Sequence, residues 1–566
     1  MFEEISDLEL IKEYEKSNET CKKLSWNTFV RYNIRDVELV DKLEDKLKLL
    51  ELIILMAYDA KVNYSTIFSP VATWDTIIYN HLYHKGIVVP KQVHHSKNEQ
   101  FEGGYVKDSM SGMFKWVVSI DATALYPSVI QSCNISPETL IGVDENITVD
   151  GLLERLYGDN HFDRAFAYCG NGAMFSKFEK GFIPEVIDVY QVKRKEAKNL
   201  MLKKQAELEA GIGDLELLVK EIASLNNKQQ AVKILMNSLF GALTNKYFRY
   251  FNLELGRAIT LTGQYITQTN FIEINKYLNK IIGSDDVDYI IAGDTDSVYM
   301  NLGPFVDKFI PNLSDEETCK LLDKFCQDKL AKKLDEINNS LQDYINVYRR
   351  NISFKREAIA NRGLWTGAKK RYILSVMNNE GVQYAEPKLK IVGLEMIKSN
   401  TPEVARKKLK EAVKIILYQT EEKLHTYVSD FKKEWDKIPA EKIAFPSSVN
   451  GIEKWSCSTN LYKVSTPIHV RGTIIYNKYI KSMKLEKNYP IIREGEKIKY
   501  IYIKTPNEFH ENVIAFLGKL PSEFPVSKRV DYRLMFEKLF IKQLDAILLP
   551  IGWTAEPKAS LEDIFG

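Results

Sequence analysis

The most informative pattern of apolar and polar positions lies between residues 289 and 299, where two short β-prone segments flank Gly293-Asp-Thr-Asp-Ser297. This pattern predicts a β-hairpin that carries two carboxylates at or beside its tip. Residues i and i+2 of a strand point to the same side, so Asp294 and Asp296 can face one site. Neighbouring carboxylates repel each other, and folding seldom places them together without a cation between them. For an isolated Asp-x-Asp, an acidic turn in water is the better interpretation, so the rest of the chain must decide.

Apolar residues recur at helical spacing in two longer stretches of the chain. Leu43, Leu47, Leu50 and Ile54 recur at helical intervals between charged residues, which predicts that residues 1 to about 58 are helical. The pattern from about 184 to 245 predicts two long helices, the second running from about Asp214 to Ala242. The short break at Gly211-Ile-Gly213 predicts that these two helices form an antiparallel hairpin.

Other elements are shorter or begin at clear signals. The apolar run from Phe114 to Ile120 predicts a strand that ends at Asp121. A mixed α/β region spans 246 to about 393. Beyond it, Thr401-Pro402-Glu403 offers an N-cap and a first-turn proline, which predicts a long helix to about Val428.

Composition narrows the function classes. A chain of 566 residues has room for roughly three to five domains, and its net charge of +2 announces no global affinity for nucleic acid. The six cysteines form no C-x-x-C pair, which argues against a zinc site or a disulfide framework and suits a reducing cytoplasm. The longest apolar stretch, near Leu52 to Tyr58, is too short to span a bilayer, and the acidic N-terminus does not resemble a signal peptide. We therefore expect no membrane partner.

Asp121 opens the run Asp121-Ala-Thr-Ala-Leu125-Tyr126-Pro127-Ser128. A carboxylate at the end of a strand is a natural hard-oxygen ligand for Mg²⁺, and Tyr126 places a flat ring beside it. The alternative is a strand cap followed by a tyrosine that packs in the core. Taken alone, this run favours the structural alternative.

The second long helix carries a cation, an amide and a ring on one face, because Lys233, Asn237 and Phe240 are spaced i, i+4 and i+7. Gly241 would allow a base or a strand to approach closely. On the first helix Arg194 and Lys198 stand at i and i+4 and could grip phosphate oxygens. Most helical lysines are simply solvated, so the hypothesis depends on both helices of the hairpin offering cations.

A third group of cations lies further along the chain. Lys369-Lys370-Arg371-Tyr372 is followed by Lys388 and Lys390 on a segment with strand-like alternation. Cations on one face of a strand make a track for a phosphate backbone. A solvated basic edge strand would look the same.

Taken in order, these tracts resemble the motifs of family B DNA polymerases. The three polymerase motifs correspond to Asp121-x-x-x-Leu125-Tyr126-Pro127-Ser128, Lys233-x-x-x-Asn237-Ser238-x-Phe240-Gly241 and Gly293-Asp294-Thr-Asp296-Ser297. Lys369-Lys370-Arg371-Tyr372 resembles the fourth signature and Lys388-Leu-Lys390-Ile-Val-Gly393 the fifth. The chain is most similar to the replicative polymerases of large tailed phages with contractile tails, over nearly its whole length. Five motifs in the right order are specific, whereas any one alone is not.

The resemblance implies an α+β multidomain fold shaped like a right hand, with a ferredoxin-like palm sheet and helical-hairpin fingers. The implied divisions are an exonuclease remnant at 1–58, a linker or N-terminal-domain remnant at 59–105, palm at 106–182 and 246–393, fingers at 183–245, and a thumb with a clamp-binding tail at 394–566.

The resemblance also implies a role for each matching residue. Asp121 and Asp296 would bind two Mg²⁺ ions with help from the Ala122 carbonyl, while Asp294 shapes the site and Glu357 is a further nearby carboxylate. Nucleotide binding would fall to Ala124, Leu125, Tyr126, Arg194, Lys198, Lys233, Asn237 and Phe240, with the Tyr126 ring excluding ribonucleotides. Primer–template DNA would contact Gly103, Gly104, Lys369, Lys370, Arg371, Tyr372, Lys388 and Lys390.

Three positions depart from the usual family pattern. Phe240 stands where tyrosine is common, which keeps the ring against the nascent base pair but puts a minor-groove hydrogen bond in doubt. Ala124 replaces a common serine and Ala292 a tyrosine seen in many relatives. No expected metal ligand is lost.

The N-terminal stretch departs further. Tyr32-Asn-Ile-Arg-Asp36 resembles the last motif of the family's 3′–5′ exonuclease, with Asp36 as a metal ligand. The earlier motifs have no convincing counterpart, because Asp7-Leu-Glu9 lies in a helix-like acidic stretch that indicates a solvated face. We therefore expect one subunit of a split polymerase that cannot proofread alone, with a separate chain carrying the N-terminal domain and most of the exonuclease. The alternatives are a polymerase that works alone without an exonuclease and a non-catalytic DNA-binding remnant.

The last residues resemble the tail with which phage relatives hold a sliding clamp, through Leu561, Ile564 and Phe565. A tail that packs on its own thumb is the alternative. The implied setting is the cytoplasm of an infected host, with deoxynucleoside triphosphates and primer–template DNA as the other partners.

Overall fold

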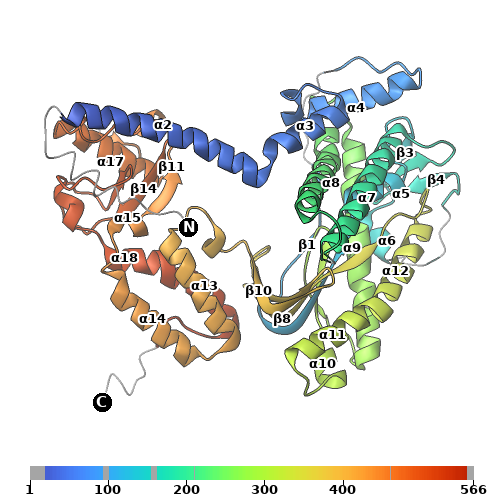
Figure 1. The fold of residues 1–566 in the computed structure, drawn as a ribbon. Helices are drawn as coiled ribbons and strands as arrows, with labels where there is room; N and C mark the ends of the chain where they lie inside the picture. Colours follow the sequence, from blue (N-terminus) through green and yellow to red (C-terminus); the bar gives the residue numbers. More distant parts are fainter. Residues whose placement is uncertain are drawn as a thin grey trace. The chain divides into compact units, whose positions relative to one another are not determined.

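The computed structural model describes residues 20–93, 101–154, 158, 162–209, 211–458 and 460–557. These residues fall into two compact units. The first unit lies within Met1–Gly103, Ala124–Tyr265 and Asn339–Ile352, and the second within Gly104–Thr123, Ile266–Asn338 and Ser353–Gly566. Mixed helix and antiparallel sheet make this an α+β chain, as the sequence predicts (Figure 1).

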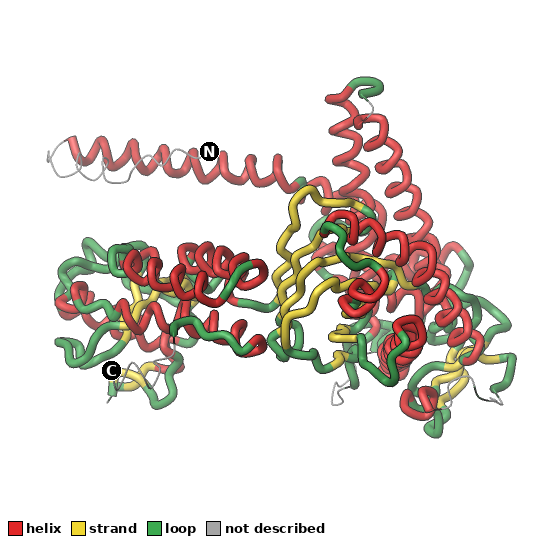
Figure 2. Tube along the Cα trace, turned by 90° about the horizontal axis from the view of Figure 1, so that it is seen from below, coloured by secondary structure: helices red, strands yellow, loops and turns green. Residues whose placement is uncertain are grey.

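The second unit is built on a seven-stranded antiparallel sheet with the order β1-β6-β7-β2-β8-β9-β10. Figure 2 colours the strands of the chain yellow. Its strands are β1 Val106–Lys107, β2 Gly112–Ala122, β6 Ile290–Asp294, β7 Ser297–Asn301, β8 Phe354–Trp365, β9 Tyr372–Asn379 and β10 Val382–Val392. The predicted hairpin at 289–299 is confirmed as β6 and β7, and the predicted strand before Asp121 is confirmed as β2. Because β2 is central, Asp121 lies opposite Ser297 on one side and Lys355 on the other.

Buried side chains hold this sheet together. Tyr299, Trp365 and Tyr372 form an aromatic cluster in which the hydroxyls of Tyr299 and Tyr372 lie 2.8 Å apart. Ala292 is buried opposite Tyr299. The helices that follow the hairpin are α10 Gly303–Phe309, α11 Asp315–Phe325, the π-helix η2 Cys326–Leu330 and α12 Ala331–Tyr344.

The C-terminal part of the second unit has its own helices and a small sheet, β11-β14-β15. Its elements are η3 Glu395–Ile397, α13 Glu403–Tyr418, α14 Glu421–Trp435, α15 Ala440–Ile443, β11 Phe445–Ser448, α16 Ile452–Trp455, β12 Ser456–Cys457, β13 Leu461–Tyr462, α17 Ile468–Ser482, β14 Lys497–Tyr502, β15 Val513–Phe516, η4 Pro525–Lys528, α18 Tyr532–Phe536, η5 Glu537–Ile541, α19 Lys542–Leu548 and η6 Leu549–Ile551. Trp435, Tyr476 and Phe540 are among the large side chains buried in its core.

The prediction of one long helix from Glu403 to about Val428 is wrong, because the chain bends between α13 and α14. Gln419 and Thr420 adopt extended backbone conformations. The first turn of α14 is held by Glu421, which accepts hydrogen bonds from the Thr554 backbone N–H at 2.7 Å and its hydroxyl at 3.1 Å. This contact across 133 residues has no counterpart in the local helical pattern.

The first unit contains the predicted helical hairpin, which is confirmed as α7 Phe182–Glu209 and α8 Leu215–Leu243 (Figure 1). Gly211 and Gly213 both have positive φ, and the Asp214 side chain caps α8 by accepting from the backbone N–H groups of Glu216 and Leu217. The same unit holds α5 Leu125–Ser132, α6 Val149–Glu154 and a three-stranded sheet of β3 Leu140–Val143, β5 Ala173–Ser176 and β4 Phe166–Tyr168. Helix α9, Leu253–Ile282, contributes to both units.

The N-terminal stretch is helical as predicted over its described residues, in α2 Thr20–Leu47 and α3 Leu49–Ala60. Lys48 breaks it with a left-handed backbone. After η1 Thr66–Phe68 and α4 Pro70–His84, α3 and α4 pack on the helical hairpin. The Trp74 indole N–H, for example, donates to the Ser238 hydroxyl at 3.0 Å. Among the described helices, none has the length and apolar character needed to cross a membrane.

Candidate active site

The tip of the β6–β7 hairpin is a two-residue turn of Thr295 and Asp296, since Asp294 pairs with Ser297. Thr295 has a φ of 57°, which is an outlier for a β-branched residue. Three hydrogen bonds hold this conformation: the Asp296 N–H donates to the Asp294 carbonyl at 2.6 Å, the Thr295 N–H to the Tyr105 carbonyl at 2.8 Å, and the Thr267 hydroxyl to the Thr295 carbonyl at 2.7 Å. Strain that the surroundings over-determine in this way is typical of functional sites.

Gly104 lies directly against this tip. A Cβ added at Gly104 would come within 2.7 Å of the Thr295 hydroxyl oxygen and 2.8 Å of its methyl carbon. At the adjacent Gly103, an added Cβ would meet nothing within 4 Å. The structure therefore gives Gly104 a packing role at the hairpin, which the sequence did not indicate. The proposed contact of both glycines with DNA stays a prediction.

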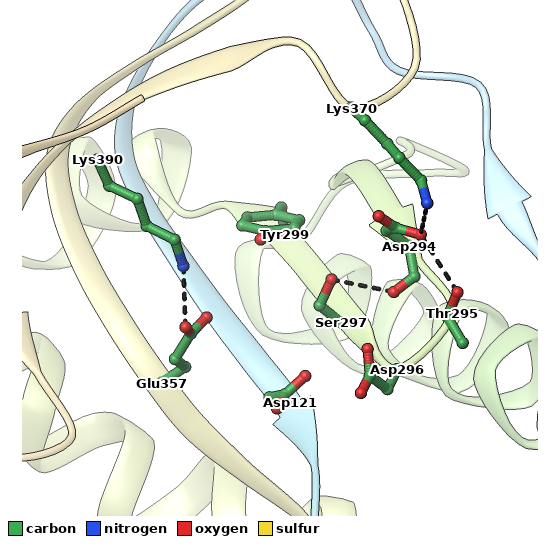
Figure 3. A pocket seen from close by; sticks show the side chains of 9 residues that line it. All are labelled: Asp121, Asp294, Thr295, Asp296, Ser297, Tyr299, Glu357, Lys370 and Lys390. Atoms are coloured by element: carbon green, nitrogen blue, oxygen red, sulfur yellow. Dashed lines mark hydrogen bonds and ion pairs between the residues drawn. The ribbon is translucent and has the colours of Figure 1, made fainter. Parts of the chain in front are cut away.

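A backbone hydrogen bond joins strand β2 to the hairpin tip. The Ala122 N–H, next to Asp121, donates to the Asp296 carbonyl at 2.9 Å. Asp121 and Asp296, which are far apart in sequence, line one pocket of about 460 Å³ together with Asp294 and Glu357 (Figure 3). The other lining residues are Thr295, Ser297, Tyr299, Lys370 and Lys390. The pocket thus gathers four carboxylates and two amines from five segments of the second unit.

Two of the carboxylates are paired with cations. Lys370 lies 3.2 Å from Asp294, and Lys390 lies 2.9 Å from Glu357. Burial opposes the charge of Lys390, but the hydrogen bond and negative charge of Glu357 outweigh it and raise the lysine pKa. Glu357 also accepts from the Ser119 hydroxyl at 3.1 Å, which fixes its orientation on β8.

Asp296 carries an unfavourable charge. Burial raises its pKa, and the charges of Asp294 and Glu357 raise it further, while its own backbone N–H and Lys370 act in the opposite direction. Hard carboxylate oxygens and an uncompensated negative field are what a divalent cation requires. Within the described residues, no three His, Cys, Asp or Glu side chains already converge into a cluster that could hold a metal ion.

The predicted basic residues occupy distinct places around the sheet. Lys369 donates to the Val106 carbonyl at 3.1 Å, Arg371 pairs with Glu395 at 2.9 Å, and Lys388 lies over the Tyr384 ring at 4.0 Å. Lys370 has a φ of 61°, and a Cβ on Gly393 would come within 2.1 Å of its carbonyl oxygen. Tyr372 is buried on Tyr299, so its hydroxyl faces the core. Of the predicted cations, the structure brings Lys370 and Lys390 into the pocket.

The residues predicted to bind nucleotide all belong to the first unit. Arg194 and Lys198 lie on α7, and Lys233, Asn237 and Phe240 lie on α8. Ala124 caps α5 in a left-handed conformation, with Leu125 and Tyr126 in the first turn. The rings of Tyr126 and Phe240 have centroids 4.7 Å apart, so the structure joins the first and second motifs through this contact. Their roles in binding a nucleotide stay predictions.

Sequence reasoning missed Thr295, Ser297 and Tyr299 as pocket residues, although the Gly-Asp-Thr-Asp-Ser tract contains the first two. It also missed Thr267, for which no local signal exists. Tyr32 and Asp36 lie one turn apart on α2. Asp7, Glu9 and the tail residues Leu561, Ile564 and Phe565 lie outside the described residues.

Comparisons with known proteins relate the chain to DNA polymerases. Residues 73–316 match the model of DNA polymerase family B. The chain is 32% identical, over 95% of its length, to the DNA-directed DNA polymerase of Enterobacteria phage T4, and it shows the same identity and coverage with that of Escherichia phage RB69. It is 24% identical to the DNA polymerase of Desulfurococcus sp. (strain Tok) over 81% of this chain and 48% of that protein. By these comparisons the chain is similar to members of DNA polymerase family B, and 95% of its length aligns with the polymerases of the two phages. It spans 65% and 64% of the length of the two phage relatives.

Proposed function

We propose that this chain is a DNA-directed DNA polymerase, which adds deoxynucleotides to a primer in the 5′–3′ direction under the direction of a template. The observation that carries the proposal is that Asp121, at the end of β2, and Asp296, in the turn before the neighbouring strand β7, line one pocket. The family match and the phage relatives support it. The seven-stranded sheet would be the palm, α7 and α8 the fingers, and the helices after Gly393 the thumb.

Asp121, Asp296 and the Ala122 carbonyl would hold two Mg²⁺ ions. When bound, such ions lower the pKa of a primer hydroxyl and stabilise the charge of the leaving pyrophosphate. Asp294 would keep Lys370 in place, and Lys370 would approach the primer end. Glu357 would hold Lys390 beside the pocket, while Lys369, Arg371 and Lys388 would follow the DNA backbone.

Residues of the first unit would bind the nucleotide. Arg194, Lys198, Lys233 and Asn237 would hold the triphosphate oxygens, and the backbone N–H groups of Leu125 and Tyr126 would add donors. The Tyr126 ring, which contacts Phe240, would occupy the space of a ribose 2′-hydroxyl.

Primer extension on a labelled primer–template tests the proposal. Asp121→Asn should lower the extension rate by at least about 100-fold, because an amide cannot replace an ionised metal ligand. Asp285→Asn, at an exposed aspartate, is the matched control and should leave the rate unchanged. Equal activity of Asp121→Asn and the parent chain would contradict the polymerase proposal and favour a non-catalytic DNA-binding remnant.

We also propose that the chain is one subunit of a split polymerase that acts in the cytoplasm of an infected host. The proposal rests on Asp36, which resembles a ligand of the family's exonuclease, whereas Asp7-Leu-Glu9 is no convincing counterpart of an earlier exonuclease motif. The isolated chain should leave a labelled primer intact with Mg²⁺ and no nucleotides. Shortening that Asp36→Ala abolishes would contradict this, and native protein purified without a second chain would favour a polymerase that works alone.

We base the proposal of a sliding-clamp partner on the C-terminal tail. Deleting residues 561–566 should lower processivity in the presence of a sliding clamp and leave synthesis without a clamp unchanged. Loss of both activities would indicate that the tail packs on its own thumb.

A further inference from the structure

Helix α9 passes directly behind the Tyr126 side chain at Gly263. Among the described residues outside this turn of α9, the atoms nearest to a Cβ added at Gly263 are Cε1 of Tyr126 and Cδ2 of Leu125, each at 3.4 Å. That distance is the near limit of ordinary van der Waals contact, so a methyl group would fit without a clash. The glycine therefore leaves a methyl-sized space between the helix and the ring.

Packing does not require a glycine at this position. Gly256 lies two turns earlier on the same face of α9, and a Cβ added there would come within 2.8 Å of Cγ2 of Thr244. Glycine is needed at Gly256 for that close approach, whereas alanine would be accommodated at Gly263. An interior glycine also weakens a helix relative to alanine, since it has the most backbone freedom to lose on folding. Gly263 thus costs helix stability, and its structural effect is the methyl-sized space behind Tyr126.

The other neighbours of the Tyr126 ring hold it more firmly. The Phe240 ring packs on it with centroids 4.7 Å apart, and Phe240 is itself in contact with the Phe101 ring at 6.3 Å. The Ser128 N–H donates to the Ala124 carbonyl at 2.9 Å, which holds the first turn of α5 and with it the Tyr126 backbone. The ring can therefore move more readily toward α9 than toward Phe240.

A nucleotide sugar can reach the Tyr126 ring from one side. The side chain is half-buried, with Leu125, Phe240 and α9 against it, so a sugar can approach only the part of the ring that stays exposed. An additional 2′-hydroxyl would press on that exposed part. Because a close-packed interior is hardly compressible, the ring would yield where the packing leaves space, and that place is Gly263.

We propose that Gly263 is a positioning residue that sets how strictly the Tyr126 ring excludes ribonucleotides, because it leaves the ring room to move back toward α9. The inference rests on the proposed polymerase function and on the role proposed there for Tyr126. It adds a determinant of sugar selectivity on a helix that carries none of the motif residues. The parent chain should therefore insert ribonucleotides more readily than a variant in which the space is filled.

Primer extension with each type of nucleotide tests the inference through the ratio of kcat/KM for deoxyribonucleotides to that for ribonucleotides. Gly263→Ala fills the space and should raise this ratio at least about threefold, whereas the control Ile272→Ala, at an exposed position of α9, should not change it. In a Tyr126→Ala background, adding Gly263→Ala should leave the ratio unchanged, because the ring through which the substitution acts is gone.

A larger side chain should push the ring toward the sugar. Gly263→Val adds atoms beyond the one methyl group that fits, so it should raise KM for deoxyribonucleotides at least about threefold, more than it lowers kcat. Because the clash is with the ring, Tyr126→Ala should restore KM in the double variant. Melting temperatures show which variants are folded, and Gly263→Ala alone decides the inference if Gly263→Val does not fold.

Fluorine NMR of a 3-fluorotyrosine placed at Tyr126 reports on the ring itself, whether or not the chain extends a primer. Rapid flipping of the ring averages its two edges into one narrow resonance, and tighter packing slows the flipping. We expect one narrow resonance from the parent chain and from Ile272→Ala, and a broadened or split resonance from Gly263→Ala.

Three results would overturn the inference: a ratio that Gly263→Ala leaves unchanged or lowers, a rise of the same size in the Tyr126→Ala background, or identical fluorine spectra of the parent and Gly263→Ala. Failure of the parent chain to extend a primer would instead contradict the polymerase proposal. The fluorine spectra would then still separate the two, because identical spectra would also overturn the role of Gly263 behind the ring.

Discussion

Lys390 and Glu357 form an ion pair of 2.9 Å inside the pocket that Asp121 and Asp296 also line. The pair joins β10 to β8 across β9, so it ties an edge strand to the centre of the sheet. It also neutralises one of the two carboxylates that disfavour the charge of Asp296. The pocket therefore pairs Asp294 and Glu357 with lysines, while the charge of Asp296 stays unfavourable.

Asp296→Asn should stabilise the metal-free protein while abolishing primer extension. The pKa of Asp296 is raised in the folded state, first by burial, so its ionised form opposes folding above that pKa. The melting temperature of the variant should exceed that of the parent at pH 7 in EDTA, and the difference should vanish as the pH falls below the unfolded pKa of about 3.9. Asp285→Asn should change neither quantity. A lower melting temperature for Asp296→Asn at pH 7 would show that the carboxylate is not destabilising.

Bound Mg²⁺ should compensate the unfavourable negative charge of Asp296. Added Mg²⁺ should raise the melting temperature of the parent chain at pH 7, by an amount that corresponds to about 2.7 kcal/mol at 100 times the dissociation constant. The increase should be absent from Asp121→Asn and Asp296→Asn, and EDTA should reverse it. Equal stabilisation of all three proteins would place the ion elsewhere.

Glu357→Gln should shift the pH dependence of Mg²⁺ binding. The charge of Glu357 raises the pKa of Asp296, so its removal should lower that pKa. The pH below which Mg²⁺ affinity falls, measured by titration monitored through protein fluorescence, should move downward. Glu380→Gln, at an exposed residue, is the control. An upward shift or none would mean that Glu357 does not act on Asp296.

Gly104→Ala should destabilise the hairpin tip, whereas Gly103→Ala should leave stability and primer extension unchanged. An added Cβ at Gly104 would clash with the Thr295 side chain at 2.7 Å, while at Gly103 it meets open space. We expect destabilisation of roughly 1–3 kcal/mol and a loss of primer extension for Gly104→Ala. Adding Thr295→Ala removes the two closest atoms, so the double variant should recover part of both losses. Strict additivity of the two substitutions would rule out this contact as the cause.

Tyr126→Ala should admit ribonucleotides. The Tyr126 ring packs on Phe240 at the first turn of α5, and its loss would open the space that a 2′-hydroxyl needs. The ratio of extension efficiencies for deoxyribonucleotides and ribonucleotides should fall by at least about tenfold, a change of about 1.4 kcal/mol. Tyr64→Ala, at an exposed tyrosine, serves as control. An unchanged ratio would place the sugar pocket elsewhere.

Local sequence patterns were sufficient to predict several helices and strands. The β6–β7 hairpin followed from alternation around a turn, and the α7–α8 hairpin followed from helical spacing interrupted by two glycines. The bend between α13 and α14 escaped prediction because the residues around Gln419 continue a helical pattern. Just after the bend, Glu421 accepts hydrogen bonds from Thr554, which lies 133 residues away in the sequence. A pattern within one window cannot contain such a contact.

The sequence by itself determined the kinds of side chain available and their order along the chain, including Asp121, Asp294 and Asp296 and the ring of Tyr126. Tertiary structure alone decided that Asp121 pairs with Ser297, that Lys390 reaches Glu357, and that Gly104 abuts Thr295. It also decided that the apolar positions of α2 lie exposed, although their helical spacing resembles that of a core helix. Periodicity records which residues share a face, whereas burial and charge balance depend on what the folded chain places opposite that face.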